Sequence, residues 1–198
     1  MNKRHLLTAT ALAAVAPMVP AAVRAPPVAG PGMLTVSGAI TNSNRGPLDA
    51  ALDQMMVKHG VAFERAHVFE AAALQRLAAV HVQPTLEYDA KVHALAGPLL
   101  TTVLEAAGVA VDVGATGDVA LTLRAVDGYA VKLSLAEVRR YRMIVAISID
   151  GHPLALGGLG PQWAVIDADR VEPFSTKPLK QRFALCPWGL YHIDVQRG

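Results

Sequence analysis

Short stretches in which apolar and polar residues alternate recur along most of this chain. A period of two is typical of strands with one buried face. Between two of these stretches, Asp127-Gly128 is a strong signal for a hairpin turn. We predict strands at 33–40, 61–69 and 80–88, a hairpin over 118–134, and further strands at 143–150, 162–167, 180–186 and 190–195.

Four other segments have helical patterns, at 47–60, 70–80, 98–108 and 135–141. In the clearest, Pro98 fits the first turn, the apolar residues form one stripe, and Gly108 fits the C-terminal cap. Ser134 and Glu137 have the spacing of a capping box before the last helix. The strands do not alternate regularly with helices, so we expect an α+β fold with mixed, mostly antiparallel sheets and a few short helices.

The N-terminus differs from the rest of the chain. Lys3 and Arg4 precede an apolar run that ends in small residues, which is the layout of a signal peptide. We predict a signal peptide over 1–25, a Pro/Gly linker over 26–32, and a single domain over 33–198. The predicted location is the periplasm, and an uncleaved membrane anchor is the alternative.

Composition limits the partners of the mature chain. Hydrophobic residues make up 53% of the 198 positions and charged residues 17%, enough apolar material for one well-filled core. The formal net charge is +2, but Lys3, Arg4 and Arg24 lie in the predicted signal peptide. Without them, 15 basic side chains face 16 acidic ones, a net charge of −1. No basic stripe remains, so we expect no nucleic-acid partner.

Motifs of common enzyme sites are missing. The seven histidines lack metal-ligand spacing, and the chain has no Gly-x-Ser-x-Gly motif. The single cysteine, Cys186, lies in an apolar run beside Pro187, so we interpret it as a buried, inert thiol. The segment 157–161, GGLGP, is neither a P-loop nor a dinucleotide fingerprint, because no Lys-Ser/Thr follows and it opens no helix.

Five segments in order resemble the sulfite oxidase superfamily. They are LTVSGAI (34–40), HALAGPLLTTVLEAAGV (93–109), AVDGYAVKLSL (125–135), DGHPLALGGLGPQWAVI (150–166) and WGLYHIDV (188–195). Together they extend over roughly residues 33–198. The chain is most similar to small exported members of this superfamily, which are described as molybdopterin-dependent oxidoreductases or molybdopterin-binding domains.

The resemblance implies a molybdopterin-binding fold with a pterin in a cleft. Catalytic members of the superfamily ligate molybdenum with a cysteine after the strand that matches 80–88, where this chain has Thr85, Leu86, Glu87 and Tyr88. They also tend to place an arginine where this chain has Trp163. Because both groups are replaced, we expect a pterin or molybdopterin-like ligand without molybdenum and without catalytic residues.

A periplasmic pterin-binding sensor or regulatory protein is therefore the favoured function, and a membrane-bound cyclic-di-GMP enzyme is its expected partner. A molybdopterin-dependent oxidoreductase with another metal ligand is the alternative. For Trp163, two interpretations stay open: it stacks on the pterin or it anchors the core. The predicted ligand-binding residues are Glu87, Tyr88, Asp127, Tyr129, Gly160, Pro161, Trp163 and Trp188.

Overall fold

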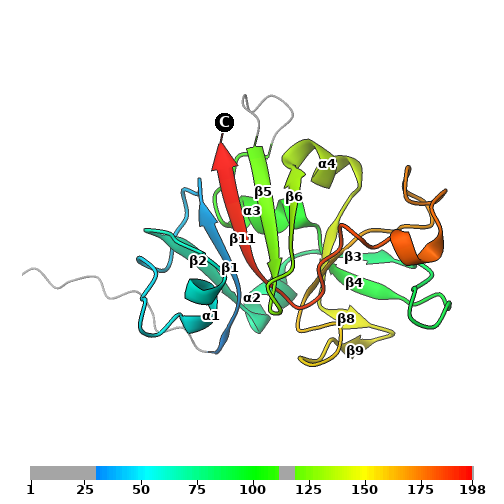
Figure 1. Cartoon of the computed structure of the whole chain (residues 1–198), viewed down its shortest axis with the longest axis horizontal. Coiled ribbons are helices and arrows are strands. Elements are labelled where there is room, and N and C mark those ends of the chain that lie inside the picture. The colour runs from blue at the N-terminus through cyan, green and yellow to red at the C-terminus, as the bar shows by residue number, and fades with distance from the viewer. Residues whose placement is uncertain (1–29, 112–118, 198) are drawn as a thin grey trace, which may run out of the picture.

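The computed structural model describes residues 30–111 and 119–197, arranged mainly as β-sheet with short helices (Figure 1). The predicted signal peptide lies outside the described residues. The largest sheet has the strand order β2-β1-β11-β5-β6. These strands are β1 (Gly32–Gly38), β2 (Ala66–Glu70), β5 (Val119–Ala125), β6 (Ala130–Ser134) and β11 (Leu190–Arg197). Only the central β1–β11 pair is parallel, so this sheet is mixed but mostly antiparallel, as the sequence predicts.

Two smaller sheets lie beside the large one. A four-stranded sheet has the order β3-β4-β8-β9, and β7 pairs with β10. Their strands are β3 (Ala79–Val82), β4 (Leu95–Pro98), β7 (Ile144–Ala146), β8 (Ser148–Ile149), β9 (His152–Pro153) and β10 (Trp163–Val165). All pairs in these two sheets are antiparallel. The α+β class is therefore confirmed in its general form.

The helices are shorter than their sequence patterns suggest. They are α1 (Gln54–Lys58), α2 (Ala71–Arg76), α3 (Leu100–Ala106) and α4 (Leu135–Arg140), with a 3₁₀ turn at Leu179–Gln181. The capping box of α4 is present, because Glu137 N donates to Ser134 Oγ at 3.1 Å and Ser134 N donates to Glu137 Oε2 at 2.8 Å. Gly108 follows α3 with a φ of +82°, as a C-terminal cap requires.

Several local predictions are wrong. The strand predicted over 61–69 begins only at Ala66. Pro98 ends β4 instead of opening α3, which begins at Leu100. The strand predicted over 80–88 ends at Val82, just before Pro84, and the remaining residues form a loop. The segment 180–186 contains turns and the end of the 3₁₀ helix instead of a strand. Its apolar side chains Phe183 and Cys186 are buried without a ladder of backbone hydrogen bonds.

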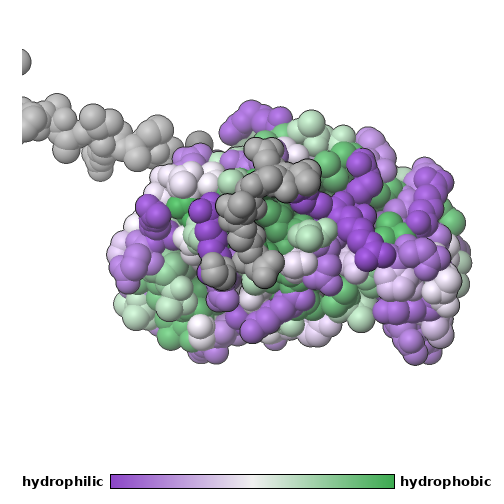
Figure 2. Space-filling model, turned by 90° about the horizontal axis from the view of Figure 1, so that it is seen from above, coloured by the Kyte–Doolittle hydropathy of each residue, from purple (hydrophilic) through white to green (hydrophobic). Residues whose placement is uncertain are grey.

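One main apolar core joins the sheets. The inward residues of β5, such as Leu121 and Leu123, are fully buried together with Val103 and Leu104 of α3. A smaller cluster of Met56, Val61 and Tyr191 lies apart from this core. On the surface viewed from above, polar and apolar residues are interspersed (Figure 2).

Candidate functional site

Three separate segments of the chain line a cavity of about 300 Å³ that is partly open to solvent. The first is the loop after β3, which contributes Glu87 and Tyr88. The second is the β5–β6 hairpin with Asp127 and Tyr129, and the third is the segment before β11, which ends at Trp188. Five of the eight predicted ligand-binding residues therefore lie around one cavity. The other lining residues are Ala125, Lys180, Phe183, Ala184, Cys186 and Pro187.

The hairpin wall follows directly from its sequence. Gly128 has a φ of +90° in the turn that the Asp127-Gly128 pair predicts, and Gly128 N donates to Ala125 O at 3.0 Å. Asp127 Oδ1 accepts from Tyr129 N at 2.9 Å. This local turn sets the position of both Asp127 and Tyr129 at the cavity.

Hydrogen bonds connect the three walls. Tyr129 Oη donates to Ala184 O at 2.7 Å, which joins the hairpin to the segment before β11. Asp169 joins that segment to the loop: its Oδ2 accepts from Thr85 N and Oγ1 at 2.7 and 2.8 Å, and its Oδ1 accepts from Arg182 at 2.6 Å. Burial opposes ionisation of Asp169, but the Thr85 donors and Arg182 outweigh it and lower its pKa. The site is thus a cross-linked structure rather than a gap between independent loops.

Aromatic rings and carboxylates dominate the accessible lining. Tyr88, Tyr129 and Trp188 are large side chains that remain partly exposed at the cavity. Glu87 and Asp127 supply two carboxylates, and Lys180 is the single cation among the lining residues. Partial burial, with Glu87 beside it, raises the pKa of Tyr88, so its phenol stays protonated and can donate. Such a lining suits a flat heterocycle that carries hydrogen-bond donors at its edge.

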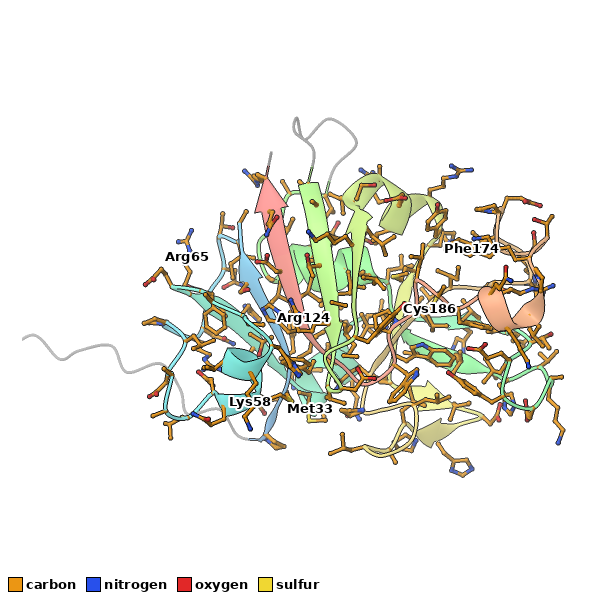
Figure 3. The ribbon with its side chains drawn as sticks, in the orientation of Figure 1. Met33, Lys58, Arg65, Arg124, Phe174 and Cys186 are labelled. Carbon is orange, nitrogen blue, oxygen red and sulfur yellow. The ribbon has the colours of Figure 1, made fainter. Side chains whose placement is uncertain are left out.

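Cys186 lies in the interior, in the segment that leads into β11 (Figure 3). Although about a hundred residues separate it from Glu87 in sequence, both line the same cavity. Burial, with a smaller contribution from Glu87, raises the pKa of its thiol to about 12. The side chain is therefore a neutral thiol, in agreement with the prediction of an inert, buried cysteine. Its place in the cavity wall could not be read from the sequence.

Trp163 belongs to the core, which corrects its predicted place in the cleft. Its side chain is fully buried, and its Nε1 donates to Cys186 O at 2.8 Å. The ring packs near Phe183, with 5.7 Å between the ring centroids. The interpretation of Trp163 as a core anchor therefore holds, and Trp188 is the tryptophan at the cavity.

Gly160 and Pro161 also lie away from the cavity. Gly160 is buried, and a Cβ at this position would lie 2.6 Å from the carbonyl carbon of Leu154. Pro161 lines a different hollow beside Met33 and Leu74. The Gly-Pro loop supports the start of β11, since Gly189 N donates to Leu159 O at 3.2 Å. Its glycine at position 160 thus serves close packing within the loop rather than contact with a ligand.

Lys180, Phe183 and Ala184 line the cavity but were not predicted as site residues from the sequence. The segment that contains them was predicted as a strand, which would have spread its side chains over two faces. Because it forms turns instead, these residues gather on the cavity side. The apolar character of the segment was the available signal for burial, but nothing in it indicated a cavity wall.

Within residues 30–111 and 119–197, no group of three or more histidine, cysteine, aspartate or glutamate side chains could hold a metal ion. None of the helices in those same residues has the length and hydropathy to span a membrane. Comparison with known proteins finds no matching family model and no matching curated sequence.

Proposed function

We propose that this chain is a pterin-binding protein of the periplasm, with a sensing or regulatory role. The observation that supports the proposal is the cavity itself, in which four aromatic side chains, three of them partly exposed, and two carboxylates meet from three distant segments. The resemblance to small exported proteins of the sulfite oxidase superfamily adds the class of ligand and the location. It also supplies the proposed partner, a membrane-bound cyclic-di-GMP enzyme.

The chemistry of a pterin matches this lining. The pyrimidine edge of a pterin carries an amino group and a ring N–H side by side, so one carboxylate can accept from both. Glu87 or Asp127 would take that edge, and Tyr88, Tyr129 and Trp188 would cover the ring faces. Aromatic stacking of this kind contributes about 0.5–1.5 kcal/mol beyond area burial. A cavity of about 300 Å³ lies at the small end of ligand sites, which fits a bicyclic ring.

A phosphate-bearing molybdenum cofactor does not fit the same residues. Such a group brings several negative charges, and the lining opposes them with Glu87 and Asp127 against Lys180 alone. A cysteine ligates a metal as the thiolate, and burial raises the pKa of the Cys186 thiol to about 12, so ligation would have to overcome the cost of ionising it.

One observation favours the alternative of a molybdopterin-dependent oxidoreductase, namely that the Cys186 thiol lines the cavity. The two functions differ in metal content. We expect protein purified from the periplasm to contain no stoichiometric molybdenum. Elemental analysis that finds about one molybdenum per chain would favour the oxidoreductase and reject the proposal.

Calorimetric titration with 6-methyltetrahydropterin tests binding itself. We expect wild-type protein to bind and Glu87→Gln to bind at least about tenfold more weakly, because hydrogen bonds to charged groups contribute ~1.5–3 kcal/mol. Glu105→Gln is the matched control, since Glu105 is on α3 and lines a separate hollow. The proposal fails if wild-type protein binds no pterin. The role of Glu87 fails if both variants bind equally well.

A further inference from the structure

One histidine, His93, lies at the base of the loop that carries Glu87 and Tyr88 into the cavity. An antiparallel β-bridge between Thr85 and Val92 closes the loop at its base. Beside this bridge, His93 N donates to Pro84 O at 3.2 Å. At its tip, Leu86 N donates to Lys91 O at 2.9 Å. The Thr85–Asp169 bonds and the buried side chain of Leu86 anchor the loop before Glu87, but neither they nor the two bonds above connect its far side to the four-stranded sheet.

His93 makes that connection through both ring nitrogens. Its Nδ1 lies 2.7 Å from Asp150 Oδ2, and its Nε2 lies 3.0 Å from Asp89 Oδ2. Asp89 is part of the loop, whereas Asp150 is in the turn between β8 and β9. Asp150 is fixed independently, because its Oδ1 accepts from Ala94 N at 2.9 Å. His93 thus joins the loop to a hairpin of the four-stranded sheet.

The geometry specifies the charge of the ring. An ionised carboxylate only accepts hydrogen bonds, and a neutral imidazole has one N–H donor and one acceptor nitrogen. Two carboxylates on opposite nitrogens can therefore both be satisfied only by the protonated imidazolium. After loss of the proton, one nitrogen faces a carboxylate oxygen with no hydrogen between them. The Asp89 contact is then the one expected to open, because it is the longer one. Both carboxylates have a second bond, but that of Asp89, from Lys91 N at 3.0 Å, stays within the loop and can move with it.

We propose that His93 is a positioning residue of the cavity: its imidazolium holds the loop of Glu87 and Tyr88 in place, and deprotonation releases the loop and weakens ligand binding. The effect on the ligand rests on the proposed pterin-binding function. The effect on the loop does not depend on any ligand.

The carboxylates beside His93 set the pH range over which its ring loses the proton. Hydrogen bonds from Asp150 and then Asp89 raise the pKa of His93 above its ordinary value near 6.5. The same bonds lower the pKa of Asp89 and Asp150, to which Lys91 and His152 respectively add smaller effects. A raised histidine pKa means that the contact is complete below about pH 6.5 and is lost as pH rises through the raised value. At acidic pH the contact is lost only when the carboxylates protonate, below their ordinary range.

Asp89→Asn provides a matched test. It removes the unfavourable approach of a carboxylate oxygen to a neutral Nε2, but it keeps a hydrogen-bonding partner for Nε2 at position 89. The amide of Asn can donate to a neutral Nε2 while Nδ1–H still donates to Asp150. His93→Gln removes the titrating group, and His81→Gln is the control at an exposed histidine of β3 that lines no part of this cavity.

Ligand-free protein is measured first, by NMR titration of the His93 ring and by amide exchange protection of residues 86–91. We expect the wild type and His81→Gln to lose protection as pH rises through the His93 titration. Asp89→Asn should stay protected, and His93→Gln should be unprotected throughout. Affinity for 6-methyltetrahydropterin should fall about fivefold over the same range in the wild type, as for a surface ion pair, and stay constant in Asp89→Asn. All variants are measured with the same ligand. Any effect of pH on the pterin itself is therefore the same for each variant and cancels when their affinities are compared.

Loop protection that is independent of pH in the wild type would overturn the role of His93, as would identical pH profiles in the wild type and Asp89→Asn. Protein that binds no pterin at any pH would instead contradict the proposed function, and the loop amides would still decide whether His93 positions the loop.

Discussion

The two tryptophans of this chain lie on adjacent backbone segments but in opposite environments. Trp163 and Trp188 form an antiparallel bridge, and Ala164 N donates to Pro187 O at 3.2 Å. Yet Trp163 is 0% exposed and Trp188 is 38% exposed. Trp163 on β10 belongs to the closely packed core, whereas Trp188 belongs to the wall of the cavity. Adjacent positions in the same sheet region can thus have opposite environments, one in the closely packed core and one at the surface of a cavity.

The largest expected effect is that of Trp163→Ala on stability. Removing a fully buried indole costs about 3–5 kcal/mol, and Cys186 O also loses its donor. Urea denaturation should show this loss in the free energy of unfolding. A cost below about 1 kcal/mol would place Trp163 outside the core and remove the contrast between the two tryptophans.

Gly128→Val should have the next largest effect, on the hairpin wall of the cavity. Position 128 has a φ of +90°, and a Cβ there would lie 3.2 Å from His59 Nε2. A β-branched residue in this conformation costs roughly 1–2 kcal/mol. Thermal unfolding measures the loss, with Gly46→Val as the control because no atom lies within 4 Å of its added Cβ. Equal melting temperatures for the two variants would show that valine is tolerated at position 128, and would contradict a turn that needs a positive φ there.

Cys186→Ser should have a smaller effect, since Cys186 lies where the core meets the cavity. A hydroxyl in place of the buried thiol costs on the order of 1 kcal/mol. Affinity for 6-methyltetrahydropterin should hardly change, because the neutral thiol serves packing. Folded Cys186→Ser protein that has lost all binding would show that the sulfur is part of the site.

Local signals in the sequence predicted local structure well. The hairpin at Asp127-Gly128, the capping box of Ser134 and Glu137, and the cap at Gly108 each depend on a few neighbouring residues, and all three are present. The prediction of a strand around Phe183 and Cys186 is wrong, because an apolar run indicates burial but not strand geometry. Its burial comes from tertiary packing that no local pattern contains.

The candidate site was predictable only in part. The resemblance pointed to Tyr129 and Trp188, which do line the cavity, but also to Trp163, which is buried because both faces of β10 are covered. Glu87 and Cys186 are about a hundred residues apart in sequence, yet the fold brings both to the same cavity, on different walls. Which distant segments meet is decided by sheet pairing, such as that of β5 with β11, and a single sequence does not reveal it.

Fluorescence quenching by 6-methyltetrahydropterin tests the central claim, that the cavity beside Trp188 takes a pterin, most directly. We expect saturable quenching in the wild type, beyond the absorption effect seen with free N-acetyltryptophanamide. Trp188→Phe should lose most of this quenching and remain as stable as the wild type to within about 0.5 kcal/mol, because its side chain is partly exposed. Absence of saturable quenching from the wild type would contradict a pterin site at this cavity. Quenching as strong in Trp188→Phe as in the wild type would contradict the contact of the pterin with Trp188.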